Sequence, residues 1–427
     1  MMVSLAPAAS TPVAANPDVI VIGGGPAGAT VATLVAREGR RVVLFERERF
    51  PRYHVGESLI PETFWVFERL GMIDRLRQAS FVKKRSVQFV TGTGKLSEPF
   101  YFQDHKPHES SQTWQVLRSE FDCMMLDNAR AAGVEVHEGV RVLEVLFDGP
   151  RAVGVAIADD LAPGGRREIH AAVVVDAAGQ STLIQDRLGL REWDPVLKKA
   201  ALWTYWQGAQ RDGGRDEGAT LVMQLDNKLG WFWYIPLHDD VVSVGVVAPF
   251  DYLFKNRAAK DHETIYMEEV ARCPGVQPRI AAASRVAPFR AAKEYSYRAK
   301  QVAGDGWVLV GDAYGFLDPL YSSGILLALH SGALAADCIV AGLSAGDTSA
   351  SRLGAWGPSY VEGMERMRRL VCEFYDGFNF GGFVKKHPDL KGHITDLLIG
   401  DLFSAKTDVI VEPMEAFRRE RHAAPAM

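Results

Sequence analysis

The sequence predicts an α/β fold: a Rossmann-type nucleotide-binding domain, an inserted antiparallel β-sheet and a C-terminal helical segment. Residues 18–45 contain an apolar run, a glycine-rich turn, a helical stretch and a second apolar run, which is the order of a βαβ unit. Another apolar run, at 307–310, ends in Gly311-Asp312. The chain between these regions is β-rich, most clearly over residues 202–249. The nucleotide-binding domain is therefore expected to be discontinuous, with the sheet inserted into it.

Size and composition describe an ordinary globular enzyme. A chain of 427 residues is long enough for two subdomains, and 47% apolar and 24% charged residues are typical of a soluble protein. The formal net charge of −5 gives no support to a nucleic-acid partner, which would require a basic face. The four cysteines lack the paired spacing of a zinc site or a disulfide framework. We therefore expect no metal and a reduced, cytoplasmic location.

The N-terminus and the apolar stretches give no sign of export or membrane insertion. Residues 1–17 are rich in Ala, Pro and Ser and lack the positive start and apolar core of a secretory signal, so a disordered tail is expected. The longest apolar stretches, such as 325–329, are too short to cross a bilayer. These features predict a soluble protein without a membrane partner.

Local patterns predict the remaining elements in chain order. Helices are expected at residues 27–36, 57–76 and 121–132, and the chain beyond 322 is expected to be mostly helical. Strands are expected at 18–22, 41–45, 87–90, 98–102, 113–117, 134–137, 173–176, 221–225, 230–237, 241–247 and 307–310. Residues 140–147 and 151–158 are expected to pair as a hairpin around Asp148-Gly149-Pro150.

These elements predict three structured parts after the tail. The nucleotide-binding domain is assigned to residues 18–86, 116–200 and 286–345, and the β-sheet substrate domain to 87–115 and 201–285. Residues 346–427 form the expected C-terminal helical segment.

The first turn carries a phosphate-binding pattern. Gly23, Gly25 and Gly28 form G-x-G-x-x-G directly after the first strand: the first glycine permits a tight turn, the second a close pyrophosphate and the third close helix–strand packing. The helix N-terminus offers free N–H groups to phosphates. Glu46 ends the next strand, where a carboxylate can accept both ribose hydroxyls. The predicted dinucleotide-binding residues are Gly23, Gly25, Pro26, Ala27, Gly28 and Glu46.

Two later segments favour FAD as the dinucleotide. The strand ending in Gly311-Asp312 resembles that of glutathione-reductase-like and hydroxybenzoate-hydroxylase-like flavoproteins, in which this aspartate binds the ribityl chain. Arg118 resembles the arginine that many members of this superfamily place over FAD. The resemblance implies a Rossmann-type FAD-binding domain. The alternatives are a plain turn aspartate and a solvated charge at a helix entry.

The strand 231–236 reads Trp-Phe-Trp-Tyr-Ile-Pro. Alternate side chains share a face, so Trp231, Trp233 and Ile235 should form one apolar wall, and Pro236 should end the strand. The pattern W-x-W-x-I-P resembles that of flavin-dependent halogenases. The resemblance implies that FADH2, oxygen and chloride or bromide produce hypohalous acid, while the tryptophans keep the organic substrate away from the flavin. The alternative is an aromatic strand in a sheet core.

Residues 316–324 resemble the F-x-x-P-x-x-S-x-G stretch of these halogenases, with Pro319 expected at the cofactor. They precede a helix expected from about 325 to 341. Free backbone N–H groups of Ser323 and Gly324 at its N-terminus would bind a halide ion. Helix capping by the serine is the other interpretation, and the two are compatible.

The family also places a lysine between flavin and substrate, where it delivers hypohalous acid to an electron-rich carbon. Aligning residues 81–89 on the family segment puts Lys84 there, with Lys83 as the alternative. Strand alternation would point Lys84 away from both neighbouring cations.

Residues 52–58 resemble the strap that links the flavin and substrate sites in these halogenases, which implies that Arg52, Val55 and Gly56 lie at the flavin. Gly56 would let the backbone approach the isoalloxazine ring, whereas the role of His54 stays open.

Tryptophan halogenases carry a glutamate where this chain has Tyr321, so the chain resembles the halogenases of phenols or pyrroles more closely. Such small aromatic substrates are often held on an acyl or peptidyl carrier protein, and a separate flavin reductase is expected because no second nucleotide-binding pattern is visible. An FAD-dependent aromatic monooxygenase, a geranylgeranyl-reductase-like oxidoreductase and a non-catalytic flavoprotein remain alternatives.

Overall fold

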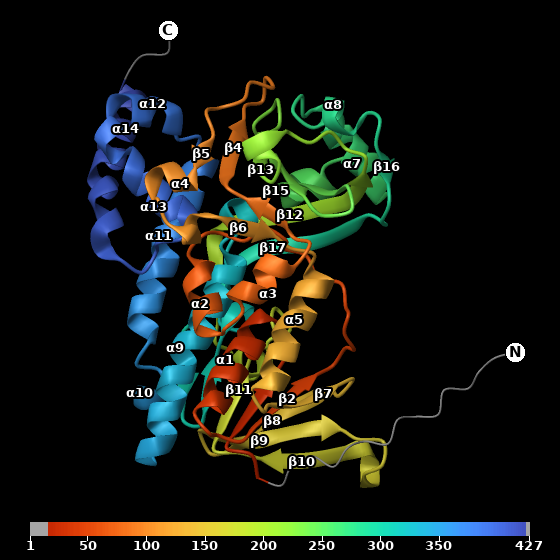
Figure 1. Ribbon diagram of the computed structural model, residues 1–427, viewed down its shortest axis with the longest axis vertical. Coiled ribbons are helices and arrows are strands. Elements are labelled where there is room, and N and C mark those ends of the chain that lie inside the picture. The colour runs from red at the N-terminus through yellow and green to blue at the C-terminus, as the bar shows by residue number, and fades with distance from the viewer. Residues whose placement is uncertain (1–15, 424–427) are drawn as a thin grey trace, which may run out of the picture.

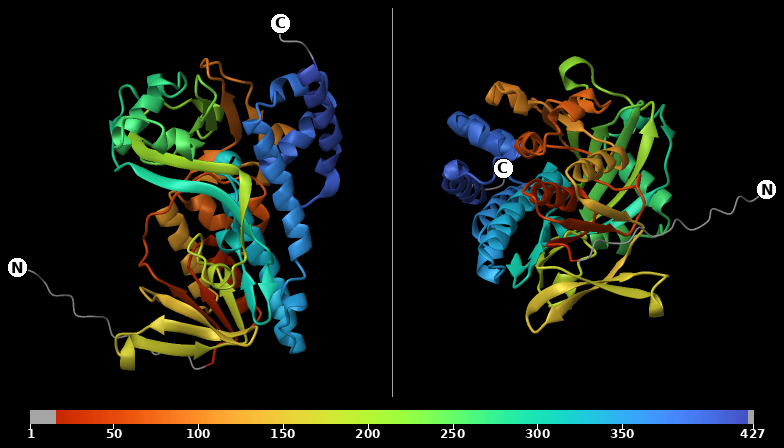
Figure 2. Two further views of the ribbon diagram at one scale, coloured as in Figure 1. Left: turned by 180° about the vertical axis from the view of Figure 1, so that it is seen from behind. Right: turned by 60° about the horizontal axis from the view of Figure 1, so that its bottom comes forward.

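The computed structural model describes residues 16–423, so the tail expected at 1–17 lies almost entirely outside the described residues. A parallel sheet and its helices form the lower half of the view in Figure 1, a large sheet lies above them, and the C-terminal helices run along one side. Figure 2 shows from behind that the longest strands of the large sheet extend down toward the parallel sheet. The four cysteines are free.

The parallel sheet has six strands in the order β18-β19-β11-β1-β2-β7, and only the short edge strand β18 is antiparallel to its neighbour. Its central strands β1 and β11 are buried along their whole length and almost entirely apolar, as expected for strands that are covered on both faces. The strands are β1 (Val19–Ile22), β2 (Val42–Glu46), β7 (Glu135–Glu138), β11 (Val173–Asp176), β18 (Ala303–Gly304) and β19 (Trp307–Leu309). The expected βαβ unit and the late strand are thus confirmed as parts of one sheet.

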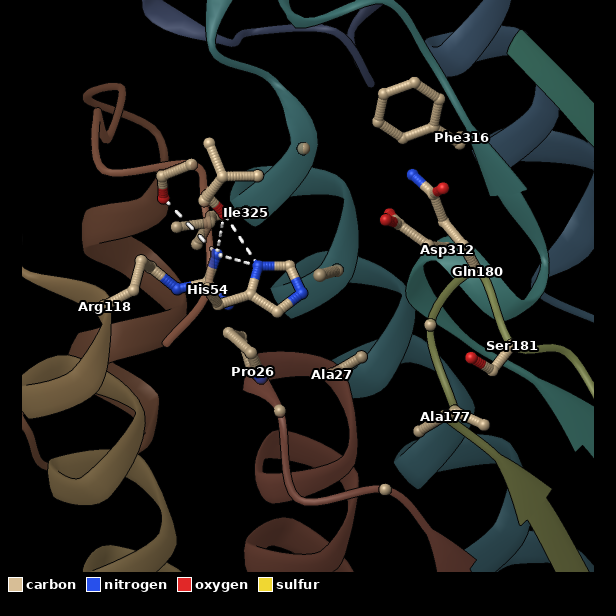
Figure 3. A pocket seen from close by; sticks show the side chains of 18 of the residues that line it. Pro26, Ala27, His54, Arg118, Ala177, Gln180, Ser181, Asp312, Phe316 and Ile325 are labelled. Atoms are coloured by element: carbon tan, nitrogen blue, oxygen red, sulfur yellow. Dashed lines mark hydrogen bonds between the residues drawn. The ribbon is translucent and has the colours of Figure 1, made fainter. Parts of the chain in front are cut away.

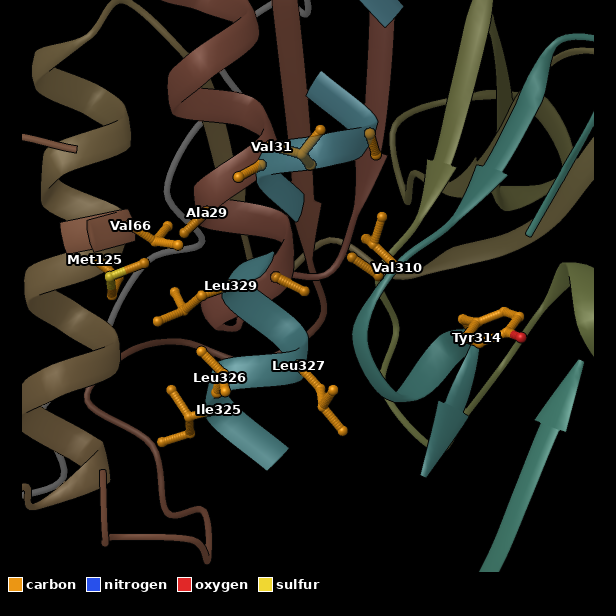
Figure 4. Packing of buried hydrophobic residues seen from close by; sticks show 14 of the residues in the cluster. Ala29, Val31, Val66, Met125, Val310, Tyr314, Ile325, Leu326, Leu327 and Leu329 are labelled. Carbon is orange, nitrogen blue, oxygen red and sulfur yellow. The ribbon is translucent and has the colours of Figure 1, made fainter. Parts of the chain in front are cut away.

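Helices α1 (Pro26–Arg37) and α9 (Gly324–Ala345) pack closely beside this sheet. A Cβ on Gly332 of α9 would lie 2.8 Å from the carbonyl oxygen of Ala27, so this glycine permits the close approach. Leu329 of α9 and Val66 belong to the same buried cluster (Figure 4). Because α9 begins immediately after the predicted halide-binding loop, this packing fixes the position of the helix N-terminus.

A three-stranded sheet extends the lower end of the molecule and contains the expected hairpin, β8 (Val142–Asp148) with β9 (Arg151–Ala158). Its third strand, β10 (Arg166–His170), was not expected. Strands β3 (Val82–Lys84) and β6 (Thr113–Gln115) form a separate two-stranded antiparallel sheet.

The large sheet has nine strands, with the path β20-β17-β12-β15-β14-β13-β4-β5 and β16 paired to β12. Its pairs are antiparallel except β13 with β4, which are parallel; the long connection between these two strands permits this direction, which a hairpin would not. One face contributes to the main core and the other to a separate cluster under α7 and α8. The strands are β4 (Ser86–Val90), β5 (Phe100–Tyr101), β12 (Arg191–Gln207), β13 (Thr220–Gln224), β14 (Trp231–Pro236), β15 (Val241–Pro249), β16 (Ser284–Arg285), β17 (Arg290–Ala299) and β20 (Gly315–Phe316).

Strand pairing differs from the expected domain division, most extensively in β12 and β17. The first ten residues of β12 and all of β17 belong to the nine-stranded sheet, although the sequence assigned them to the nucleotide-binding domain. The reason is that β12 continues through a bulge between Trp193 and Lys198, where Asp194-Pro195 hides the strand pattern.

The prediction of one helix at residues 57–76 is wrong for its first residues, and the remainder forms two helices instead of one. Residues 57–60 are not helical, and Ser58 forms a β-bridge with Gln115. Gly71, in the left-handed region with φ +64°, then separates α2 from α3. The strand expected at 98–102 is shorter, because Phe102 begins a helical turn. The helices outside α1 and α9 are α2 (Thr63–Arg69), α3 (Ile73–Gln78), α4 (Phe102–His105), α5 (Arg118–Ala131), α6 (Ile184–Arg187), α7 (His262–Ala271), α8 (Gln277–Ile280), α10 (Ala350–Leu353), α11 (Gly357–Tyr375), α12 (Phe380–Lys386), α13 (Lys391–Ile399) and α14 (Val411–Ala423).

Within residues 16–423, α9 alone is long and apolar enough to cross a membrane by length and composition. This differs from the expectation that every apolar stretch is too short, because the helix continues through alanines and glycines beyond Leu329. Inside the fold, 56% of its most apolar window is buried. The core helix of a globular protein meets the same criterion.

Candidate active site

A cavity of about 390 Å³ is lined by residues from both main sheets. Four segments reach it: the glycine-rich turn, residues 52–58, strand β14 and the chain from 310 to 328. The predicted cofactor residues that line it are Gly23, Gly25, Pro26, Ala27, Glu46, Arg52, Val55, Gly56, Arg118, Asp312 and Pro319. Figure 3 shows Pro26 and Ala27 at the start of α1 facing His54 and, across the cavity, Asp312 and Phe316.

The three glycines of the turn have different surroundings. Gly23 has φ +103°, and a Cβ there would lie 2.4 Å from the carbonyl oxygen of Ala177. A Cβ on Gly28 would lie 2.0 Å from the carbonyl oxygen of Gly23, so any larger residue here would prevent the close packing of the helix on the strand. At Gly25 the nearest atom would be 3.6 Å away, on Arg52, which leaves open cavity in front of the backbone. Gly23 and Gly28 therefore shape the turn, whereas Gly25 leaves room for a phosphate group.

The carboxylate of Glu46 supports the turn from the end of β2. Its Oε2 accepts the N–H of Gly24 at 2.7 Å, and Oε1 accepts the N–H of Glu48 at 2.9 Å. Each carboxylate oxygen can accept a further hydrogen bond. Glu46 also lines the cavity, so acceptor capacity for ribose hydroxyls remains.

Gly311 lies behind the cavity wall rather than on it. Its φ is +59°, and a Cβ would lie 2.9 Å from that of Ala27. The N–H of Gly311 donates to Ser331 Oγ at 2.9 Å. This glycine lets the turn before Asp312 pass close to α1.

Arg118 fixes the strap of residues 52–58 against α5. Its guanidinium donates to both carboxylate oxygens of Asp122, at 2.8 and 3.0 Å, and to the carbonyl oxygen of Val55 at 2.6 Å. Arg52 donates to the same carboxylate at 3.0 Å. Asp122 is fully buried, and its two arginine partners compensate its charge. The strap backbone at Gly56 is thereby held on the cavity wall.

Asp312 and His54, which face the cavity, have shifted pKa values. Burial raises the pKa of Asp312 to about 6, and the positive charge of Arg118 opposes this shift. Burial, and then the charge of Arg118, lower the pKa of His54 to about 4. His54 is therefore neutral at neutral pH, and Figure 3 shows its ring beside the guanidinium of Arg118.

Strand β14 forms an apolar wall on the cavity. Trp231, Trp233 and Ile235 line it, and the two indole rings are 6.4 Å apart. Phe232 and Tyr234 point the other way, into the second hydrophobic cluster. This alternation is the one that the sequence predicts. Pro236 ends the strand and is not among the lining residues.

Sequence reasoning missed the residues that hold these indoles. Trp233 Nε1 donates to Ser243 Oγ at 3.0 Å, and Trp231 Nε1 donates to Tyr375 Oη at 2.9 Å. A Cβ on Gly245 would lie 2.2 Å from the ring of Trp233, so only glycine leaves room for this indole. A glycine inside a strand is a usable signal of such close approach.

Lys84 is buried directly behind the cavity wall, with 2% of its surface exposed, whereas Lys83 is exposed. Its amine donates to Ser58 Oγ and to the carbonyl oxygen of Leu59, both at 2.9 Å. Ser58 lines the cavity. Burial lowers the pKa of Lys84 to about 7, so charged and neutral forms coexist at neutral pH.

The segment before α9 provides free hydrogen-bond donors. Ser322 adopts the left-handed conformation with φ +58°, and Ser322 and Gly324 line the cavity. The Ser323 side chain does not cap α9, and its buried Oγ has no hydrogen-bond partner in residues 16–423. Capping is therefore not the role of this serine in the structure. The first-turn N–H groups have no helical acceptor, which fits a small anion.

A metal centre has no support in the described part of the chain, where no group of three His, Cys, Asp or Glu side chains could hold an ion. The donors around the cavity are backbone N–H groups, arginines and hydroxyls. Together with the open space at Gly25, they fit a dinucleotide cofactor.

This fold and cavity define an FAD-binding oxidoreductase, and a family model described as an FAD binding domain matches residues 16–353. The chain is 32% identical over 422 residues to a 1H-pyrrole-2-carbonyl-(peptidyl-carrier protein) chlorinase of Pseudomonas fluorescens, covering 93% of this chain and 92% of that one. It is 30% identical to the corresponding brominase of Pseudoalteromonas luteoviolacea, covering 91% and 93%. The solved structure of the flavin-dependent brominase Bmp2 aligns with a TM-score of 0.83 at 29% identity, covering 95% of this chain and all of that one.

The chain belongs to the flavin-dependent halogenases and is an FAD-dependent halogenase that uses halide.

Proposed function

We propose that this halogenase uses FADH2, oxygen and chloride or bromide to halogenate an electron-rich aromatic ring, phenolic or pyrrolyl. One observation carries the proposal: Trp231 and Trp233 form an apolar wall of a cavity that fits FAD, and the buried amine of Lys84 donates to Ser58, which lines the same cavity. A hydroxylase would need its substrate ring beside the flavin. The wall instead favours a small diffusible oxidant.

The cofactor, when bound and reduced, would supply two electrons to oxygen, which takes two more from the halide, so that the products are hypohalous acid and water. The chain's own residues prepare this step. The strap, held by Arg118, and the turn at Gly25 bind and orient the dinucleotide. The N–H groups of Ser323 and Gly324 bind the halide at the start of α9. The indoles exclude water and organic substrate from the same space.

Lys84 receives the hypohalous acid and orients it toward the substrate carbon. In the charged form of Lys84, two of the three N–H donors have partners, which leaves one for the oxidant. At the ring, the carbon–halogen bond forms as the oxygen–halogen bond breaks. The carbon–hydrogen bond then breaks, and its proton combines with the departing hydroxide to give water. Tyr321, where tryptophan halogenases carry a glutamate, is buried and cannot act as a carboxylate, so the substrate must be activated by its own heteroatom.

Two macromolecular partners follow from the proposal. The names of the Pseudomonas and Pseudoalteromonas relatives specify a pyrrole held on a peptidyl carrier protein, and this supports a carrier-bound substrate here. The described strands include one parallel sheet with one glycine-rich phosphate turn, which the proposal assigns to FAD. A nicotinamide cofactor that reduces FAD would need a second such site. We therefore assign the supply of FADH2 to a separate flavin reductase.

The test is halide-dependent turnover by the purified chain with a flavin reductase, NADH, FAD and oxygen. Pyrrole-2-carboxylate on a peptidyl carrier protein, the free acid and a simple phenol are offered with and without bromide. The expected product carries the bromine isotope doublet in its mass spectrum and is absent without bromide. A hydroxylated product formed equally well without bromide would identify a monooxygenase instead.

A further inference from the structure

A line of hydroxyl groups connects the partly exposed Tyr53 with the cavity wall. Tyr53 is 39% exposed, and its Oη lies 3.1 Å from Tyr205 Oη. Tyr205, which is buried, donates to Glu57 Oε1 at 2.5 Å. Glu57 is 1% exposed and lines the cavity beside Gly56. Three side chains thus span from a partly exposed position to the flavin site.

The hydrogen bonds set a single direction along this line. Trp203 Nε1 donates to Tyr53 Oη at 2.6 Å, so this oxygen accepts from the indole and its own proton is free to point to Tyr205. Tyr205 uses its only proton toward Glu57 and therefore accepts from Tyr53. Both phenol protons point inward, which is the arrangement needed to pass a proton from the outside to the carboxylate.

Glu57 has no ion-pair partner within 4.0 Å in residues 16–423, in contrast to the nearby Asp122. Its carboxyl group accepts hydrogen bonds from Tyr205 Oη, from Ser243 Oγ at 3.5 Å and from the N–H of Gly56 at 3.2 Å. Burial raises the pKa of Glu57 above its usual value. A carboxyl group that serves only to hold the strap would gain from an arginine, whereas this one is able to take up and release a proton.

The halogenation reaction requires such a supply. The overall balance is one aromatic C–H, one halide ion, one O2, one FADH2 and one proton, giving the halogenated ring, FAD and two waters. The second water needs a proton from outside the substrate and cofactor. The cavity wall at Trp231 and Trp233 is apolar, so a proton must reach this part of the cavity by way of the polar side chains beside it.

We propose that Tyr53 and Tyr205 conduct protons from solvent to Glu57, which delivers them to the oxygen that is reduced to water in the cavity. Glu57 gives its proton to that oxygen, Tyr205 reprotonates Glu57, and Tyr53 reprotonates Tyr205. The need for the proton rests on the proposed function, whereas the conduction path is a property of the folded chain and can be measured separately.

The first measurement uses the oxidised FAD-loaded protein, without turnover. The infrared C=O band of the Glu57 carboxyl, recorded at a pH low enough to protonate it, is assigned by its loss in Glu57→Gln, and its shift is followed after mixing into D2O at the same pH. Tyr205→Phe removes only the central hydroxyl and should slow this exchange at least about tenfold. Tyr234→Phe is the matched control, because this buried tyrosine lies on the opposite face of the sheet and donates to Gln210.

Tyr53→Phe, at the partly exposed end, provides a second variant in case Tyr205→Phe does not fold. If whichever of these variants folds exchanges as fast as the wild type, the proposed conduction path is wrong. Turnover is measured next: in Tyr205→Phe the bromination rate should fall at least about tenfold with a larger solvent isotope effect and unchanged FAD affinity. If the infrared result holds but no variant or wild-type protein brominates any substrate, the conduction path stands and the proposed function is wrong.

Discussion

The amine of Lys84 lies 2.9 Å from the hydroxyl of Ser58, and that hydroxyl lies 2.9 Å from Thr220 Oγ1. Ser58 and Thr220 both line the flavin cavity, while Lys84 does not. The lysine is therefore linked to the cavity through the hydroxyl of Ser58, on a wall that the indoles of β14 also line. A buried amine without a carboxylate partner is costly to the fold, and such groups are concentrated at functional sites.

Replacing this amine should abolish halogenation and spare the cofactor. In Lys84→Met an apolar chain of similar length fills the same space, so we expect FAD affinity to stay within about twofold of the wild type while bromination falls at least about a hundredfold. Lys83→Met is the control, because Lys83 is exposed. Full bromination by Lys84→Met would remove the lysine from the mechanism.

The same substitution should change how stability depends on pH. The pKa of Lys84 is about 7 in the fold, against 10.5 for an ordinary lysine, so between these values the unfolded chain binds a proton that the folded chain does not. Stability of the wild type therefore rises with pH across this window, by up to about 1.4 kcal/mol per pH unit from this group. Lys84→Met lacks the contribution. The free energy of unfolding of Lys84→Met relative to the wild type, measured with urea near pH 7 and near pH 9.5, should therefore fall as the pH rises. A difference between the two proteins that stays constant would contradict a buried neutral amine.

Periodic patterns made part of this site predictable from the sequence. Strand β14 has a two-residue alternation that places Trp231 and Trp233 on one face whatever the rest of the fold does. The same alternation separates Lys84 from Lys83, and their burial agrees with it. The glycine-rich turn was equally visible because tight backbone contacts restrict both residue type and spacing.

Other features depend on contacts between distant segments and leave no local pattern. Glu57 and Tyr205 are 148 positions apart, and their hydrogen bond exists only after the strap packs on the nine-stranded sheet. The extent of β12 was hidden by Asp194-Pro195, since a bulge absorbs residues that look like a loop. Helices α7 and α8 were missed because they lie between strands of a segment that is otherwise β-rich.

Alanine substitutions should separate the two roles of the glycine-rich turn. At Gly28 the new Cβ would lie 2.0 Å from the backbone oxygen of Gly23, so we expect a loss of several kcal/mol of stability or failure to fold. At Gly25 the methyl group meets only the end of Arg52, so the apoprotein should keep its Tm while FAD affinity falls at least about tenfold. Thermal unfolding without FAD and fluorescence titration with FAD give both quantities. Equal destabilisation by the two substitutions would disprove this division.

Gly245→Ala should disturb the tryptophan wall from behind. The added Cβ would lie 2.2 Å from the ring of Trp233 and 2.5 Å from Trp203 Cβ, so the indole must move. Overpacking of this kind costs about 1–3 kcal/mol. We expect a red-shifted tryptophan emission and more oxygen consumed per brominated product, because the wall no longer closes. Gly213→Ala, where a Cβ meets open space, should leave both unchanged.

The halide loop should respond to a methyl group at Gly324. A Cβ there meets no atom within 4 Å, so the fold has room for it, but Gly324 lines the cavity beside the first-turn N–H groups of α9. A hydrogen bond to an ion contributes about 1.5–3 kcal/mol, and a methyl group that displaces the ion from one such donor should raise the bromide concentration for half-maximal activity at least about tenfold. FAD affinity and Tm should stay unchanged, as they should in Gly381→Ala, a helical glycine of α12 without a tight contact. If Gly324→Ala instead weakened FAD binding and left the bromide dependence as it was, the N-terminus of α9 would belong to the cofactor site and the halide would have to bind elsewhere.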